Sequence, residues 1–188
     1  MKRIAIFASG SGSNFEAIVD AYNRGELNCE PALCVCDRKG AYVIERARKL
    51  NVPVIVAHPR DFEDKAAYER FLLEKLMELD IDLICLAGYM RLIGEVLLEG
   101  YGNRIINIHP SLLPAFKGAH AIKDAFDYGV KVYGVTIHFV DETLDGGKII
   151  SQGAFPYEGT DFEELESRIH KLEHQLYPKT INKIISNL

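Results

Sequence analysis

An asparagine and a histidine that lie two residues apart, Asn107 and His109, are the strongest candidates for chemistry in this 188-residue chain. They follow the apolar pair Ile105-Ile106, which is typical of a buried strand. Residues two apart on a strand point to the same face, and Pro110 cannot donate a ladder hydrogen bond. We therefore expect an amide donor and an imidazole side by side at the end of a core strand, where they could bind an oxyanion and move a proton.

A loop rich in glycine and serine, Ser9-Gly10-Ser11-Gly12-Ser13-Asn14, lies between the first expected strand and the first expected helix. Backbone N–H groups at a helix start, together with the helix dipole, favour an anion. The loop lacks the lysine of a P-loop, and Phe15 stands where a dinucleotide fingerprint has its third glycine. It therefore favours a single phosphate over a dinucleotide, although a plain turn with a polar helix cap fits the same residues.

An acidic turn, Leu144-Asp145-Gly146-Gly147, separates the last two expected strands. Taken alone, an aspartate before two glycines is typical of a turn whose side chain bonds its own backbone. The functional alternative is a carboxylate that orients His109 or a water. Arg91 is a candidate cation, because it follows a strand and ligands of open α/β sheets bind beyond the carboxyl ends of strands.

The other histidines and the cysteines have structural interpretations that compete with functional ones. His120 either caps a helix or lines a cleft, whereas His138 lies in an apolar run and is expected to be a hydrogen-bonded core residue. His170 and His174 have the spacing of metal ligands on a helix, but no third ligand is near, so we expect no metal site. We expect buried core thiols at all four cysteines, Cys29, Cys34, Cys36 and Cys85.

Short apolar runs alternate with amphipathic segments, a pattern that predicts a parallel sheet with right-handed crossovers. The expected strands are Ile4–Ala8, Ala32–Cys36, Val52–Ala57, Ile81–Ala87 and Arg104–His109. The expected helices cover about residues 14–22, Tyr42–Leu50 and Asp61–Leu79. Two later strands, Lys131–Val140 and Gly147–Phe155, precede a helix from about Asp161, which Pro178 should end or kink.

The composition is typical of a single globular domain spanning residues 1–188. The chain is 48% hydrophobic and 26% charged, and its length is sufficient to bury roughly 70% of the unfolded surface. Its net charge of −5 argues against a nucleic-acid partner. The apolar run after Arg3 is too short for a secretory segment, and no run approaches the roughly 18 residues of a membrane span. We therefore expect a cytoplasmic protein without a membrane partner.

Together these motifs resemble the phosphoribosylglycinamide formyltransferase family, folate-dependent enzymes of purine synthesis, over essentially the whole chain. The matching segments are residues 9–14, 87–91, 107–114, 118–120 and 144–147, with Glu173-His174 before Tyr177-Pro178. The resemblance implies an α/β fold: a Rossmann-like, open, mostly parallel twisted sheet with helices on both faces and a late antiparallel strand. It also implies a phosphate- and substrate-binding part over about residues 1–100, and a folate-binding and catalytic part over about 101–188.

The resemblance further implies transfer of the formyl group of 10-formyltetrahydrofolate, as co-substrate, to the amine of glycinamide ribonucleotide. It implies no metal, and we expect a monomer or homodimer. The implied catalytic residues are Asn107, His109 and Asp145. The implied substrate-binding residues are Ser11, Gly12, Ser13, Asn14, Lys65 and Glu173, with lysine at 65 where arginine is common. The implied folate-binding residues are Met90, Arg91, Leu92, Ile93, His120, Val140, Asp141 and Asp145.

Formyl transfer is acyl transfer to an amine, and the residues suit it. Asn107 and a protonated His109 can donate to a tetrahedral oxyanion, and Asp145 would favour the charged imidazole. Ser111 has no obvious base beside it, so we expect direct transfer without an acyl-enzyme.

Four other functions compete with formyl transfer to glycinamide ribonucleotide as interpretations of the sequence. A methionyl-tRNA formyltransferase and a formyltetrahydrofolate hydrolase are each expected to carry a further domain. Many members of the family that the chain resembles have a tail after the last helix, and we expect that tail to be dispensable. A non-catalytic binding module would not need the intact trio of Asn107, His109 and Asp145. A Rossmann dehydrogenase is disfavoured by Phe15.

Overall fold

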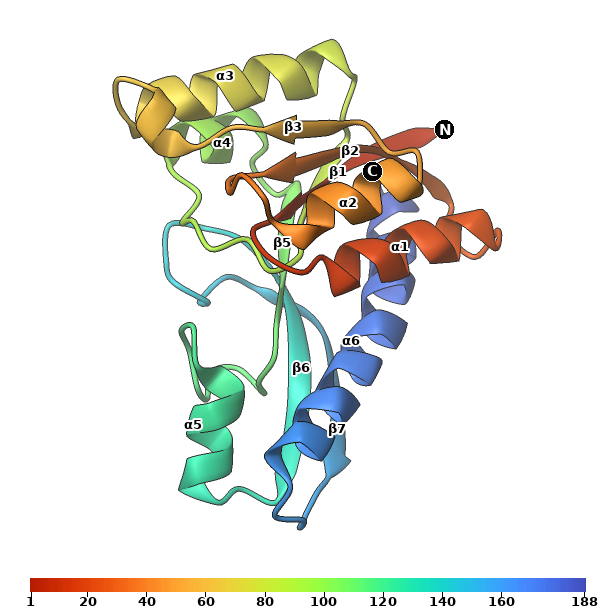
Figure 1. Cartoon of the computed structure of the whole chain (residues 1–188), viewed down its shortest axis with the longest axis vertical. Helices are drawn as coiled ribbons and strands as arrows, with labels where there is room; N and C mark the ends of the chain where they lie inside the picture. The colour runs from red at the N-terminus through yellow and green to blue at the C-terminus, as the bar shows by residue number, and fades with distance from the viewer.

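The computed structural model describes residues 1–188 and contains one seven-stranded sheet with helices packed on both faces (Figure 1). The strands are β1 (Lys2–Ala8), β2 (Cys29–Cys36), β3 (Val54–Val56), β4 (Leu83–Leu86), β5 (Ile105–His109), β6 (Val132–Phe139) and β7 (Ile149–Pro156). The helices are α1 (Ser13–Asn23), α2 (Tyr42–Lys49), α3 (Lys65–Glu78), α4 (Glu95–Gly100), α5 (Ala121–Tyr128) and α6 (Phe162–Ile185), with a 3-10 turn, η1, at Pro59–Asp61.

The strand order is β3-β2-β1-β4-β5-β6-β7. Strands β1 to β5 pair in parallel, whereas β6 runs antiparallel to both β5 and β7. The expected α/β fold with a mostly parallel sheet and a late antiparallel strand is therefore confirmed. The chain order reverses between the adjacent strands β1 and β4, so the loops that leave them diverge and open a crevice at the carboxyl edge.

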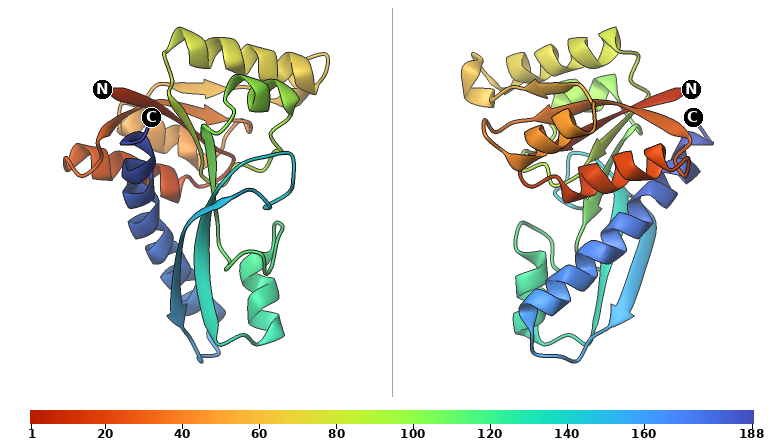
Figure 2. Two further views of the ribbon diagram at one scale, coloured as in Figure 1. Left: turned by 180° about the vertical axis from the view of Figure 1, so that it is seen from behind. Right: turned by 45° about the vertical axis from the view of Figure 1, so that its right-hand side comes forward.

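Two apolar clusters hold the layers together. The larger joins β-strand side chains to α1, α2 and α6, for example through Phe15, Val43 and Ile181. The smaller joins the other face of the sheet to α3 and α4 through Leu72 and Leu97. Figure 2 shows α6 running along the sheet from the β6–β7 end to the parallel end, where both chain termini lie.

The structure differs from the sequence prediction in two local respects. Helix α4 was not predicted, because its start is capped from another element: the buried Glu69 accepts hydrogen bonds from the N–H groups of Gly94 (2.6 Å) and Leu97 (3.2 Å). Of the two outcomes predicted at Pro178, an end or a kink in the last helix, the end is excluded, since α6 continues to Ile185. Pro178 is buried, as are Tyr177 and Ile181 nearby, and burial of this face favours the helix against the roughly 3 kcal/mol that an interior proline costs.

The cysteine prediction is confirmed, since all four thiols are free and buried. Burial raises the pKa of Cys29 and of Cys34 to about 12, so both are uncharged. None of the helices is both long enough and apolar enough to cross a bilayer.

Tyr177 ties α6 to the middle of the sheet. Its hydroxyl is fully buried and donates to the carbonyl of Leu86 on β4 at 2.8 Å, with Ile106 O on β5 at 3.4 Å. Strand β5 ends in the candidate catalytic residues Asn107 and His109, and β4 leads to Arg91, so the contact supports the site from behind.

Replacing Tyr177 with phenylalanine should lower the free energy of unfolding by about 1–2 kcal/mol, because the buried carbonyls lose their donor. Urea denaturation measures this change. The matched control is Tyr128→Phe, since the Tyr128 side chain is exposed and should change stability by less than about 0.5 kcal/mol. Equal losses in the two variants would contradict the role given to Tyr177.

Candidate active site

Two cavities open at the carboxyl edge of the sheet and share a wall. The glycine-loop cavity, of about 560 Å³, lies between residues 10–14 and the β4–α4 loop, and also reaches His109 and Glu173. The acidic-loop cavity, of about 640 Å³, lies between α4 and the loop Asp141–Gly146, which we call the acidic loop. The residues that line both cavities are Tyr89, Arg91, Leu92, Asn107, Leu144 and Asp145. Two of the three predicted catalytic residues therefore stand where the cavities meet.

Asn107 and His109 lie at the end of β5, and both line the glycine-loop cavity, as expected for residues two apart on a strand. The Asn107 amide nitrogen lies 3.2 Å from Nε2 of His138, its neighbour on β6. His109 is buried, with Nε2 2.8 Å from the carbonyl of Phe116. A carbonyl only accepts, so Nε2 carries a proton and Nδ1 is the nitrogen left for chemistry.

Asp145 faces His109 from the acidic loop. Its Oδ2 lies 3.6 Å from His109 Nδ1 and accepts a 2.9 Å hydrogen bond from the N–H of Gly118. The contact with the imidazole is attractive only when Nδ1 carries a proton, because both atoms otherwise present lone pairs. The Asp145 carboxylate therefore faces Nδ1, the imidazole nitrogen that is left for chemistry.

The return of the acidic loop to β6 depends on Gly147. A side chain there would collide with the Phe139 carbonyl, which lies 1.8 Å from the position that a Cβ would occupy. Asp145 itself has a left-handed backbone, with φ 49°. Aspartate tolerates this conformation better than most residues, so one residue both forms the turn and occupies the position of the predicted catalytic carboxylate.

The glycine loop ends at the start of α1, where backbone N–H groups are free to donate. Gly12 is the N-cap residue, with φ 78°, and the N–H groups of Ser13 and Asn14 have no acceptor within the protein. These donors lie at the positive end of the α1 dipole and line the glycine-loop cavity. The local geometry fits an anion, as the sequence predicted.

Glu173 on α6 is buried at the same cavity and has two polar neighbours. Its Oε2 accepts from the side-chain nitrogen of Asn14 at 3.2 Å and lies 2.7 Å from Nδ1 of His170. The hydrogen bond to Glu173 raises the pKa of His170, while burial lowers the pKa of His174. His170, which the sequence offered only as a metal ligand, thus pairs with Glu173 at the cavity wall.

The wall between the cavities is held by two buried residues from the parallel strands. The fully buried Asp37 accepts from Nε of Arg91 at 2.7 Å, which fixes the guanidinium. Ser9 Oγ accepts from the N–H of Met90 at 2.8 Å and so ties the glycine loop to the β4–α4 loop. Arg91 is thereby a positioned cation rather than a free surface charge.

The residues predicted to bind the substrate and those predicted to bind the folate do not separate cleanly into the two cavities. The glycine-loop cavity is lined by Ser11, Gly12, Ser13, Asn14, Met90 and Glu173, and the acidic-loop cavity by Lys65, Ile93, Val140 and Asp141. Lys65 is therefore separated from the other predicted substrate contacts. His120 is exposed, lines neither of these cavities and makes no capping hydrogen bond. Residues from both halves of the chain line each cavity.

Comparison with known proteins agrees with this geometry. The family model described as formyl transferase matches residues 2–181. The chain is 51% identical to a phosphoribosylglycinamide formyltransferase of Bacillus subtilis (strain 168), covering 98% of this chain and 95% of that protein. A solved glycinamide ribonucleotide transformylase 1 from Geobacillus kaustophilus superposes with a TM-score of 0.95, at 55% identity over 98% of both chains. A solved phosphoribosylglycinamide formyltransferase from Bacillus halodurans superposes with a TM-score of 0.94, at 50% identity over 98% of this chain and 96% of that chain.

The chain belongs to the formyl transferase family. Within that family it groups with the phosphoribosylglycinamide formyltransferases, and it is an enzyme of purine biosynthesis.

The glycine loop provides a matched pair of substitutions. At Gly12 a Cβ would lie 2.4 Å from Val43 Cγ2 and 2.9 Å from Val43 Cα, with a strained positive φ, whereas at Gly10 it would meet nothing within 4 Å. Gly12→Ala should therefore lower the free energy of unfolding by about 2–3 kcal/mol, and Gly10→Ala by less than about 0.5 kcal/mol. Chemical denaturation decides this, and similar stabilities for the two variants would refute the tight approach of α1 to α2.

The pair formed by His170 and Glu173 should make stability depend on pH. Because the folded-state pKa of His170 lies above its ordinary value of 6.5, its contribution is fully present below pH 6.5 and is lost as pH rises through the folded pKa. Between pH 6 and pH 8 the wild type should lose more stability than His170→Gln. The exposed His120→Gln is the control and should follow the wild type; a His170→Gln profile parallel to that of the wild type would exclude the pairing.

Proposed function

We propose that this enzyme transfers the formyl group of 10-formyltetrahydrofolate to the amine of glycinamide ribonucleotide, giving formylglycinamide ribonucleotide and tetrahydrofolate on the route to IMP. The observation that supports this most strongly is the pair of cavities that share Asn107 and Asp145. A transfer between two small molecules requires two binding sites whose reacting ends meet at one catalytic group. Each cavity suits one of the two molecules.

The glycine-loop cavity suits the phosphorylated amine. The free N–H groups of Ser13 and Asn14 at the start of α1 would hold the phosphate, with Ser11 and Gly12 completing the loop. Glu173 lies across the same cavity, where its carboxylate can accept from ribose hydroxyls. This arrangement directs the glycine amine of the substrate toward Asn107 and His109.

The acidic-loop cavity suits the folate. Its floor and sides combine apolar residues, including Leu92, Ile93 and Val140, with the backbone and carboxylates of the acidic loop. We assign Arg91 and Lys65 to the anionic end of the folate, because both are cations at this cavity. Lys65 is thus moved from the amine substrate, where the resemblance placed it, to the folate.

The reaction follows from these positions. The amine attacks the formyl carbon, and the carbonyl oxygen becomes an oxyanion that the Asn107 amide and the protonated Nδ1 of His109 can stabilise. Oδ2 of Asp145 lies 3.6 Å from that nitrogen and attracts it when it carries a proton. As the tetrahedral intermediate collapses, the C–N bond to the folate breaks, and the proton lost by the amine reaches the folate nitrogen through a positioned group or water.

The direct assay is formyl release from 10-formyltetrahydrofolate with and without glycinamide ribonucleotide. We expect turnover only when the amine is present, with one formyl group transferred per folate consumed. Equal turnover without the amine would identify a hydrolase and contradict the proposal.

Changing the catalytic residues should affect the chemical step. His109→Ala and Asp145→Asn should each lower kcat by about 10²–10³-fold, because each weakens stabilisation of the oxyanion. Binding of the phosphorylated amine, measured by calorimetry, should change little. Lys123→Gln on the exposed side of α5 is the control and should keep the wild-type kcat. Near-normal turnover in both site variants would overturn the assigned roles.

Transfer should occur without a formylated protein. The hydroxyl of Ser111 donates to the carbonyl of Ala115 at 2.6 Å and has no base beside it, so it is poorly placed as a nucleophile. Rapid-quench mass spectrometry after a single turnover should find formyl only on folate or product. A protein species heavier by one formyl group, formed and consumed at catalytic rates, would contradict direct transfer.

A further inference from the structure

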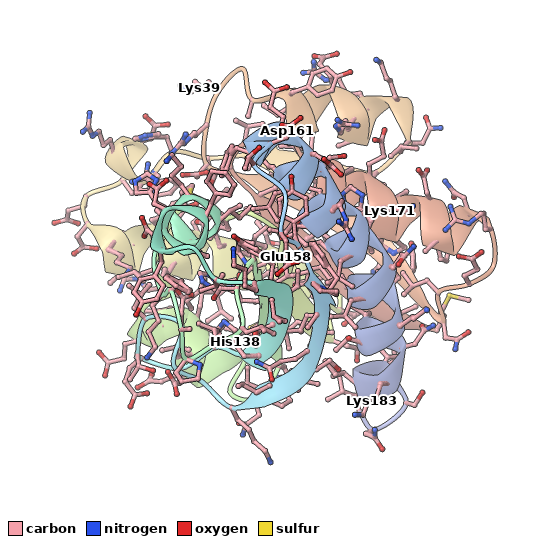
Figure 3. All side chains as sticks on the ribbon, turned by 90° about the horizontal axis from the view of Figure 1, so that it is seen from below. Lys39, His138, Glu158, Asp161, Lys171 and Lys183 are labelled. Atoms are coloured by element: carbon pink, nitrogen blue, oxygen red, sulfur yellow. The ribbon has the colours of Figure 1, made fainter.

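His138 is a buried histidine at the reacting end of the site, for which the sequence predicted only a structural role. It lies on β6 directly opposite Asn107 in the antiparallel pairing with β5, and it is 2% exposed. It lines the acidic-loop cavity beside Asn107 and Asp145. Figure 3 labels His138 together with Lys171 and Lys183 of α6, and in this view His138 does not overlap either lysine. Its surroundings are therefore those of the site and not of the outer helix.

The hydrogen bonds of His138 determine which of its nitrogens carries the proton. Nδ1 lies 2.8 Å from the carbonyl of Phe139, and a carbonyl can only accept, so Nδ1 is the donor. In the neutral ring Nε2 is then a bare acceptor. It lies 3.2 Å from the side-chain nitrogen of Asn107, so it accepts one N–H of that amide. No other protein group bonds the Asn107 side chain, which leaves the second N–H for a ligand.

The amide of Asn107 is thus oriented by its neighbour rather than by its own backbone. An asparagine amide can rotate by half a turn at little cost in shape, and this rotation exchanges a donor for an acceptor. Because Nε2 of neutral His138 presents only a lone pair, it selects the orientation with the NH₂ group facing it. Nε2 also lies 4.0 Å from Asp145 Oδ1, so this NH₂ group lies at the junction of the cavities.

The surroundings of His138 shift its pKa in opposite directions. Burial lowers the pKa of His138, and the nearby His109 also lowers it, whereas the Phe139 carbonyl, Asp145 and Asp141 raise it. The net direction is downward, which is consistent with a neutral ring. A protonated ring would place an N–H on Nε2, repel the Asn107 NH₂ group and turn the amide oxygen toward itself.

We propose that His138 is a positioning residue for the transfer reaction: its neutral, Nδ1-protonated ring aims the NH₂ group of Asn107 at the formyl oxygen. This inference rests on the proposed function, in which Asn107 stabilises the oxyanion. His138 itself touches neither substrate in this role. Its role is to orient the Asn107 amide, so replacing His138 should lower kcat more than it weakens substrate binding.

The kinetic test is a double-mutant cycle. His138→Leu should lower kcat by about 10–100-fold, less than the loss of an oxyanion donor, while KM for both substrates stays within about threefold. In an Asn107→Ala background the same change should lower kcat by less than about twofold, because there is no amide left to orient. His138→Gln, which offers a neutral acceptor, should recover part of the rate. Full additivity, or a loss confined to KM, would overturn the proposal.

A second measurement uses the wild-type protein, so it does not require any variant to fold. In wild-type protein with ¹⁵N-labelled histidine, NMR at pH 7.5 should show His138 protonated on Nδ1 and unprotonated on Nε2. A proton on Nε2 would overturn the proposal. The two levels of inference can fail separately. If the wild type transfers no formyl group, the proposed function fails; if transfer and the Asn107→Ala loss are observed but His138→Leu keeps full kcat, only the role of His138 fails.

Discussion

The antiparallel pairing of β6 with β5 is the constraint on which the site depends. It sets His138 opposite Asn107, and it returns the chain through the acidic loop so that Asp145 faces His109. One strand that runs against the others therefore supplies two of the contacts that organise the reacting groups.

The parallel half of the sheet contributes the complementary feature. Because the chain order reverses between β1 and β4, the glycine loop and the β4–α4 loop separate and leave room for ligands. Ser9 and Asp37 then fix these loops from below, through Met90 and Arg91. The loop that leads to the free N–H groups of α1, and Arg91, which lines both cavities, are therefore held close to strand ends. Such fixed positions suit the proposed reaction between two substrates.

Much of this could be predicted from the sequence, because the relevant signals are local. The alternation of apolar and amphipathic runs gave the parallel strands, the spacing of Asn107 and His109 placed them on one face, and the glycine loop indicated an anion site. Asp145 was predicted as a turn former, and the catalytic position that we propose for it coincides with that turn. The resemblance to the formyltransferases added the assignment of substrates, and the comparisons confirm the family.

The features that escaped prediction depend on contacts between distant segments. Helix α4 begins where Glu69 caps it from α3, and α6 continues through Pro178 because the proline packs into the core. The partnership of His138 with Asn107 depends on the register of β6, which no local pattern specifies. Lys65 lies at the acidic-loop cavity because of how α3 packs beside α4. Residue spacing alone carries none of this information.

A crystal structure with glycinamide ribonucleotide and a non-reactive folate analogue bound together tests the central claim most directly. We predict the phosphate on the N–H groups at the start of α1, the pterin ring in the acidic-loop cavity, and the amine and the formyl-bearing nitrogen on either side of Asn107. The NH₂ group of Asn107 should lie within hydrogen-bond distance of the oxygen that stands for the formyl carbonyl. Both ligands in one cavity, or a reacting end remote from Asn107 and His109, would contradict it.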